Sequence, residues 1–261
     1  MDLPHRTLSD LRRIQNMVCN SDVKVYRYKD DLVKAILTCQ RGNPIKVVKS
    51  SAPLIPIGAR RRLLAILDGL SWDRYAVKDS RIFRSLASKS TGSLVLGATQ
   101  GPRNTPMFDS TRGREGKAFN MNIITSTTAK DQTELLELWY IMKELVRSID
   151  PAYHFSSIQI NKDFTGLPHT DRNNVNYQYA MSLGEFNGGE LVVSTDDPYL
   201  YVQHNTQNRL TKCDGRHPHW VTKHTGGVRY SLIMYDITGK KRRRLSNIPE
   251  SIRIPSSSAK P

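Results

Sequence analysis

The sequence FSSIQINKDFTGLPHTD at residues 155–171 begins the part of the chain that decides the fold. From Phe155 to Ile237, short runs of alternating apolar and polar residues follow one another, separated by Gly, Pro, Asn and Asp. These runs predict β-strands at residues 156–161, 177–183, 190–194, 199–203, 220–223 and 228–237. Short strands at this spacing, with no helix between them, indicate a sandwich or a jelly-roll barrel.

The strands are preceded by the clearest helix signal in the chain. Apolar residues recur at helical spacing between residues 129 and 149, and Pro151 ends the pattern. Further strands are expected at residues 93–98 and 120–126, and residues 100–117 form a long loop whose role as a lid stays open. We therefore expect an α+β protein with a basic N-terminal cap or support region at 1–92, a barrel at 93–239 and a disordered basic tail at 240–261.

Charge is distributed unevenly along the 261 residues, whose formal net charge is +15. Residues 1–100 carry 18 Lys and Arg against 8 Asp and Glu, and residues 240–261 carry 7 against 1. The expected barrel between them is nearly neutral, so the flanks are suited to a polyanion such as DNA or RNA, or serve only solubility or nuclear import.

The sequence lacks the features that would indicate export, membrane insertion or a disulfide framework. No apolar run is long enough to span a membrane, and the N-terminus lacks the apolar core of a signal peptide, so we expect a soluble intracellular protein without a membrane partner. The cysteines, Cys19, Cys39 and Cys213, are odd in number and widely spaced, which argues against a disulfide framework and a structural zinc site.

Candidate metal ligands begin with His169 and Asp171, which are two residues apart. In an extended segment both side chains point to one face, where an imidazole nitrogen and a carboxylate oxygen can share an ion. So short a motif is weak without a third ligand. Among the downstream histidines, His219 and His217 are the candidates.

A hairpin argument favours His219. We read Lys223–Gly227 as a turn, which places His219 and Arg229 as cross-strand neighbours and leaves His224 pointing to solvent. His217 has the same strand parity and remains an alternative. His204 ranks low because no arginine follows it on a returning strand.

Two histidines and one carboxylate form the facial triad of non-haem Fe(II) oxygenases, which leaves coordination positions open. Such a site has room for the keto acid of 2-oxoglutarate and for O₂. The far carboxylate of 2-oxoglutarate requires a planar, bidentate cation, for which Arg229 is suited, and Ser231 adds a hydroxyl on the same strand face.

The combined motifs resemble the Fe(II)/2-oxoglutarate-dependent dioxygenases over residues 150–238: H-x-D at His169, G-G-E-L at Gly188, H-W-V-T at His219 and G-V-R-Y-S-L at Gly227. The His-Thr-Asp-Arg-Asn-Asn run is similar to the branch that contains TET and base-J-binding proteins. The resemblance implies a double-stranded β-helix (jelly-roll) barrel. It also implies Fe(II), 2-oxoglutarate and O₂ as cofactor and co-substrates, with Asn161 or Tyr179 lining the co-substrate pocket.

The expected reaction is hydroxylation or oxidation of a C–H bond, with His169, Asp171 and His219 as the catalytic metal set. A nucleobase in DNA or RNA is the expected substrate. The alternatives are a protein side chain, as in prolyl hydroxylases, a non-catalytic nucleic-acid-binding barrel, and a cupin-like metalloenzyme without 2-oxoglutarate. The Lys240–Arg244 run fits a nuclear-localisation signal or a phosphate contact; without import, a cytoplasmic location is expected. The oligomeric state stays open.

Overall fold

The computed structural model describes residues 46–75, 90–97, 129–197 and 200–249. Most of the expected N-terminal cap, the expected strand at 120–126 and the loop at 100–117 lie outside these ranges. Within the described part, no helix is long and apolar enough to cross a membrane.

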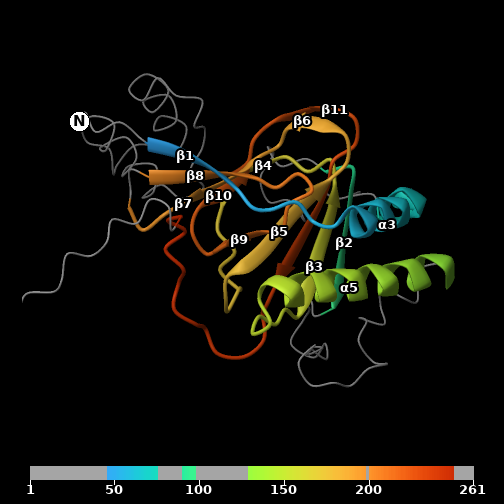
Figure 1. Ribbon diagram of the computed structural model, residues 1–261, viewed down its shortest axis with the longest axis horizontal. Helices are drawn as coiled ribbons and strands as arrows, with labels where there is room; N and C mark the ends of the chain where they lie inside the picture. Colours follow the sequence, from blue (N-terminus) through green and yellow to red (C-terminus); the bar gives the residue numbers. More distant parts are fainter. Residues whose placement is uncertain (1–45, 76–89, 98–128, 198–199, 250–261) are drawn as a thin grey trace, which may run out of the picture.

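Two five-stranded sheets form the body of the protein (Figure 1). Sheet I has the order β1 (Lys46–Ser51), β8 (Leu200–Asn205), β7 (Leu191–Ser194), β10 (His219–Val221) and β4 (Gly166–His169). Sheet II has the order β2 (Gly92–Gly97), β3 (Ser157–Lys162), β12 (Tyr230–Tyr235), β5 (Gln178–Leu183) and β9 (Thr211–Cys213). A small third sheet pairs β11 (His224–Gly226) with β6 (Phe186–Gly188).

The chain alternates between the two large sheets. It passes from β3 in sheet II to β4 in sheet I, to β5 in sheet II, to β7 and β8 in sheet I, and then to β9, β10 and β12 in sheets II, I and II. This alternation is the winding of a jelly roll. The mixed sheets, with many strands and few helices, agree with the expected fold class.

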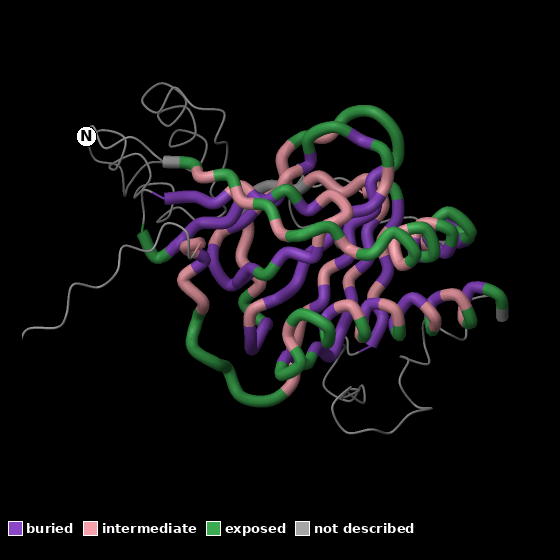
Figure 2. Tube along the Cα trace, in the orientation of Figure 1, coloured by how far each residue is buried: buried purple, intermediate pink, exposed green. Residues whose placement is uncertain are grey.

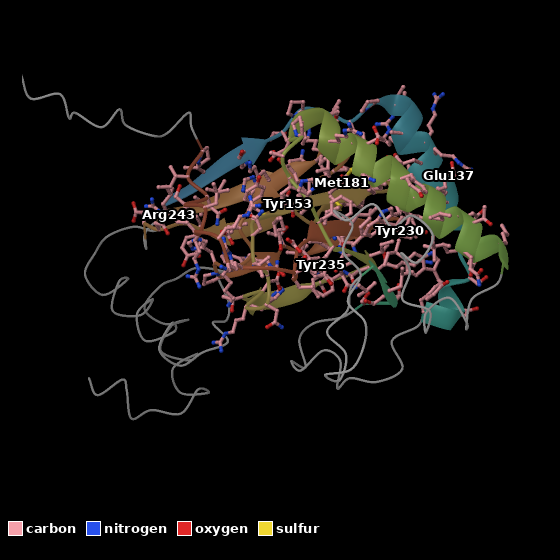
Figure 3. All side chains as sticks on the ribbon, turned by 90° about the horizontal axis from the view of Figure 1, so that it is seen from below. Glu137, Tyr153, Met181, Tyr230, Tyr235 and Arg243 are labelled. Carbon is pink, nitrogen blue, oxygen red and sulfur yellow. The ribbon has the colours of Figure 1, made fainter. Side chains whose placement is uncertain are left out.

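Two helices cover the outer face of sheet II, α5 (Ala129–Ile149) and α3 (Ile57–Gly69) (Figures 1 and 3). Leu138 and Met142 of α5 are fully buried against alternate residues of the strands, such as Ile160 and Leu232. Burial of each such side chain contributes about 1.5–3 kcal/mol. Figure 2 shows the result, a buried (purple) strip of α5 facing the sheet and exposed positions on its other side. The alternate apolar residues of the sheet II strands and the apolar stripe of α5 therefore pack together in one core.

The intervening strand residues face the interior between the sheets. Ala180, Ile233 and Cys213 of sheet II pack there against Leu191, Val193 and Val221 of sheet I. Because side chains alternate along a strand, Ser231 of β12 and its cross-strand partners Asn161 and Ser182 share this inner face. The interior is therefore partly polar, and a partly polar interior can bind a polar ligand more readily than a packed apolar core can.

The described part of the expected cap, residues 46–75, is joined to the barrel. β1 extends sheet I by pairing in parallel with β8, and α3 lies beside α5. The short helix η1 (Trp72–Tyr75) places the Trp72 ring in a stacked arrangement with Tyr230, 5.5 Å between centroids. At least this portion therefore supports the barrel directly.

Two expectations about the chain after residue 215 are wrong. His219 and Arg229 are not on paired strands: β10 pairs with β7 and β4, whereas β12 pairs with β3 and β5. Local alternation predicts strands but does not identify partners that are distant in sequence. Residues 240–249 are also not a free tail, because Leu245 and Asn247 hydrogen-bond to Asp214.

Candidate metal centre

Strand pairing brings His169 and His219 together. His169 is the last residue of β4 and lies directly opposite His219, the first residue of β10. Their imidazole rings are 4.3 Å apart between centroids. Asp171 follows β4 at a turn, where its backbone N–H donates to the Gly215 carbonyl at 2.8 Å.

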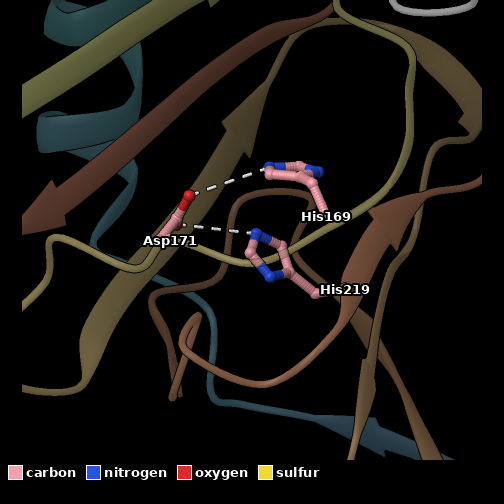
Figure 4. A group of neighbouring side chains, drawn as sticks. All are labelled: His169, Asp171 and His219. Atoms are coloured by element: carbon pink, nitrogen blue, oxygen red, sulfur yellow. Dashed lines mark ion pairs between the residues drawn. The ribbon is translucent and has the colours of Figure 1, made fainter. Parts of the chain in front are cut away.

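The three side chains converge on one point (Figure 4). Nε2 of His169 is 3.8 Å from Oδ1 of Asp171, and Nε2 of His219 is 3.6 Å from Oδ2. All three candidate ligand atoms lie within 4.8 Å of one another. Metal–ligand bonds of about 2.1 Å at right angles separate the donors by about 3 Å. A bound ion therefore needs only a small contraction of this cluster.

Hydrogen bonding fixes the ring orientation of His219. Its Nδ1–H donates to the carbonyl of His217 at 3.0 Å, so Nε2 carries the free lone pair that faces Asp171. A ligand histidine commonly donates its other N–H to a carbonyl in this way. The donor set of two imidazoles and one carboxylate fits a divalent iron ion with open positions.

His217 lies outside the cluster. Its Nε2–H donates to the carbonyl of Leu245 at 2.9 Å, and the same nitrogen is 3.7 Å from Asp196. Among the described residues, the structure therefore assembles His169, Asp171 and His219 as the group that can hold a metal. The preference for His219 agrees with this geometry, although the hairpin argument behind it does not.

The cluster is open on one side. The side chains of His169 and Asp171 are 29% and 33% exposed, whereas that of His219 is 7% exposed. A molecule can therefore approach the ligand atoms from solvent on the β4 side, while the β10 side is closed.

Arg229 is buried directly before β12 and has unused hydrogen-bonding capacity. Its Nη2–H donates to the Gly189 carbonyl at 3.0 Å, but Nε and Nη1 have no partner within the described structure. Burial lowers the pKa of Arg229 to about 10, and the charges of Glu190 and Asp163 act in the opposite direction. A buried guanidinium with two free N–H groups is a site prepared for a carboxylate.

Gly189 allows this close approach. Its φ is +71°, and a Cβ at this position would lie 2.7 Å from Nε of Arg229. The absence of a side chain at Gly189 therefore lets its backbone carbonyl contact the guanidinium.

Ser231 and Asn161 belong to a polar row on the inner face of sheet II. The row crosses four strands from Ser93 through Asn161 and Ser231 to Ser182. The Asn161 amide contacts the Ser231 hydroxyl at 3.5 Å and accepts a hydrogen bond from Ser93 at 2.8 Å. Ser231 is two residues from Arg229, so the row and the guanidinium line the same interior.

Tyr179 lies on the other face of sheet II, contrary to its expected place in the pocket. It is adjacent to the inward-facing Ala180, and its hydroxyl donates to Asp150 at 2.9 Å. Burial and the Asp150 hydrogen bond raise its pKa. Its ring packs edge-on against Tyr153 at 5.0 Å, so Tyr179 belongs to the helix-side core.

Two histidines that the sequence argument set aside are largely buried. His204 is opposite Leu191 on the inner face, and neither ring nitrogen has a partner among the described residues. Burial lowers its pKa to about 4. The His224 side chain, expected in solvent, is only 10% exposed, and burial and the charge of Arg229 lower its pKa. Strand parity with Leu191 was the available signal for His204.

No protein-family model matches this sequence, and no curated protein matches it. The structure is similar to an oxidoreductase of the 2OG-Fe(II) oxygenase family from Burkholderia pseudomallei, at 15% identity over 76% of this chain and 100% of that chain, with a TM-score of 0.34. It is similar to NgTET1 in complex with 5mC DNA, at 12% identity over 91% and 92% of the two chains, with a TM-score of 0.42. A Pseudomonas putida prolyl-4-hydroxylase has 13% identity over 70% and 88%, with a TM-score of 0.36.

Proposed function

We propose that this protein is an Fe(II)- and 2-oxoglutarate-dependent dioxygenase. One observation carries the proposal: a His-Asp-His cluster and a buried arginine with two unpartnered N–H groups occur in the same jelly-roll barrel. An iron site alone would suit many metalloproteins. The buried cation adds the requirement for an anionic co-substrate, which distinguishes this class from a metal-binding barrel without 2-oxoglutarate.

His169, Asp171 and His219 would hold the iron, which when bound supplies the activation of O₂ and the oxidation of a C–H bond. The His219 Nδ1–H bond to the His217 carbonyl orients the ring so that Nε2 is directed toward Asp171. The Asp171 backbone bond to Gly215 holds the carboxylate at the end of β4. These contacts orient the ligands before any ion arrives.

Arg229 would bind the far carboxylate of 2-oxoglutarate through Nη1, whose two N–H groups have no partner among the described residues. The contact of Nη2 with Gly189 keeps the guanidinium in place while those two N–H groups stay available. Ser231, Asn161 and the neutral His204 ring add polar groups on the inner face for the rest of the co-substrate. Burial of this end excludes water, whereas the exposed side at His169 and Asp171 admits the substrate.

For the substrate we propose a nucleobase in DNA or RNA. The support is the charge distribution, since the basic regions flank a nearly neutral barrel. Succinate release stimulated by an oligonucleotide, and not by a proline-containing peptide, is the expected result. The opposite preference would favour a prolyl-type hydroxylase.

The test of the reaction class is an anaerobic titration of Fe(II)-loaded protein with 2-oxoglutarate, followed by the visible charge-transfer band of a chelated keto acid. We expect the band in the wild type and in Asp196→Ala, a matched carboxylate control outside the cluster, and its loss in Asp171→Ala. A band of equal strength in Asp171→Ala, or no band in iron-loaded wild type, would refute the assignment.

A further inference from the structure

A basic segment after β12 is anchored to the loop that follows Asp171 of the candidate metal centre. We call residues 239–247 the basic strap; it contains the consecutive cations Lys240–Arg244. Figure 2 shows most of it as an exposed loop, and Figure 3 places Arg243 at the opposite end of the molecule from Glu137 of α5. Its position, and not only its composition, bears on what it can bind.

The strap backbone is fixed by a buried arginine. Arg216, 5% exposed, donates from Nη1 to the Arg242 carbonyl at 2.7 Å and from Nη2 to the Arg243 carbonyl at 3.1 Å. The same guanidinium forms an ion pair with buried Asp214. The cations are therefore presented from an ordered backbone.

Further hydrogen bonds hold the middle and the C-terminal end of the strap. The Arg242 backbone N–H donates to the Val175 carbonyl at 2.7 Å. Asn247 exchanges hydrogen bonds with Asp214, and its amide also donates to the Ser194 carbonyl at 3.1 Å. An ordered cation cluster loses less conformational entropy on binding an anion than a disordered tail does.

The strap side chains remain available. Lys240 to Arg244 are all exposed, and none of the ion pairs within the described residues involves them. Lys241 alone is engaged, through a 3.1 Å hydrogen bond from Nζ to the Arg172 carbonyl. The remaining cations have only solvent as a partner in the described structure.

The strap is adjacent to the loop that carries a candidate metal ligand. Arg172 and Val175, which it contacts, are one and four residues after Asp171. The strap is therefore anchored to the chain segment that directly follows Asp171.

We propose that the basic strap is a docking surface for the phosphate backbone of a nucleic acid and guides one strand toward the metal centre. The second half of this inference rests on the function proposed above; the docking surface itself does not. Four exposed cations within five residues can neutralise several neighbouring phosphates. An anionic membrane is the less favoured partner, because none of the exposed large hydrophobic residues lies in the strap or in residues 170–176.

The test measures anisotropy of a short fluorescein-labelled DNA duplex, and of the matching single strand, over a series of salt concentrations. The strap variant is Lys240→Gln/Arg243→Gln/Arg244→Gln, which leaves the Lys241 and backbone contacts intact. The matched control removes three exposed cations from α3 and α5, Arg61→Gln/Lys130→Gln/Arg147→Gln.

The strap variant should bind the DNA at least about tenfold more weakly, and the slope of log affinity against log salt should fall by about 2–3. The control should change affinity by less than about twofold. Equal loss in both variants, which would indicate net charge alone, or no loss in the strap variant, would overturn the proposal. So would binding to phosphatidylserine vesicles without binding to DNA.

The keto-acid band separates this proposal from the previous one. The strap variant should retain the band, because it alters no metal or co-substrate contact. Strap-dependent DNA binding without a band in the wild type would refute the dioxygenase and keep the docking surface. A normal band without strap-dependent DNA binding would refute the docking surface and keep the dioxygenase.

Discussion

Replacing Arg229 with methionine should change two properties in opposite directions. The side chain is 2% exposed, and methionine has a similar length without the charge. If the two free N–H groups of Arg229 await a carboxylate, the variant loses co-substrate binding. If burial of the charge is costly before that carboxylate arrives, the variant without co-substrate becomes more stable.

The expected loss of binding follows from the contacts. The two N–H groups of Nη1 offer charge-assisted hydrogen bonds to a carboxylate, and removing one partner of such a buried pair costs about 2–5 kcal/mol. A loss of about 3–4 kcal/mol weakens 2-oxoglutarate binding by a few hundredfold, at 1.4 kcal/mol for each factor of ten.

The expected gain of stability follows from burial. Lowering the pKa of Arg229 from 12.5 to about 10 shows that the folded protein disfavours the charged form, by about 3 kcal/mol. Since arginine is charged at pH 7 in both the folded and the unfolded state, this penalty is present there. Losing the Gly189 hydrogen bond offsets about 1 kcal/mol. A net gain of about 1–2 kcal/mol should raise the melting temperature by a few degrees.

The assay is thermal unfolding of the metal-free and iron-loaded protein, with and without 2-oxoglutarate. Wild type should be stabilised by 2-oxoglutarate, and Arg229→Met should melt higher without it and be unaffected by it. Arg209→Met is the control, because Arg209 also has a buried Nε without a partner but contacts the Ala52 carbonyl outside the barrel interior. An Arg229→Met protein that is less stable and still responds to 2-oxoglutarate would refute the reasoning.

Three further changes test other parts of the structure. His219→Ala should weaken Fe(II) binding by more than about 100-fold in a metal-competition titration, whereas His217→Ala should weaken it by less than about tenfold, since only the backbone carbonyl of His217 contacts His219. Burial lowers the pKa of His204 to about 4, so the folded state resists protonation, and the free energy of unfolding of the wild type should fall as pH drops from 6.5 toward 4. Urea unfolding of metal-free His204→Leu should show a smaller fall over the same pH range. An equal fall in the variant would contradict the burial argument. Arg216→Met should lower the free energy of unfolding by about 3–5 kcal/mol in urea titrations because it leaves the Asp214 carboxylate buried without its cation, and a loss below 1 kcal/mol would show that the pair is dispensable.

Elements with a strong local signal could be predicted from the sequence. The helical stripe ending before Pro151 gave the bounds of α5 within the described structure, and period-two runs located β3, β5, β7, β8 and β12 to within a few residues. The short strands β4, β6, β9 and β11 were missed, since three or four residues are too few to show a clear period. Their conformation depends on partners elsewhere in the chain.

The side chains of the candidate site could be chosen from chemistry, but their neighbours could not. His169, Asp171 and His219 are brought together by pairing of β4 with β10, fifty residues apart, which no local pattern contains. Tyr179 is adjacent to the inward-facing Ala180, so alternation along β5 directs it to the helix side. His224 was misplaced because its short strand pairs with β6, far away in the sequence. The ordered part of the basic strap was missed because its anchor, Arg216, resembles any other surface arginine in the sequence.

The strand order also determines when the candidate site can form during synthesis. β10 lies between β4 and β7, and β12 lies between β3 and β5, so the last strands of the barrel fill central positions in sheets whose other strands emerge earlier. Each sheet must therefore keep a gap with unpaired strand edges until these segments leave the ribosome. His219 comes with the first of them and Arg229 with the second, so under the proposed function the acquisition of iron and of 2-oxoglutarate would be coupled to the final step of folding. A partly synthesised chain would accordingly have neither a complete iron site nor a co-substrate pocket, and we expect it to depend on chaperones that cover exposed strand edges.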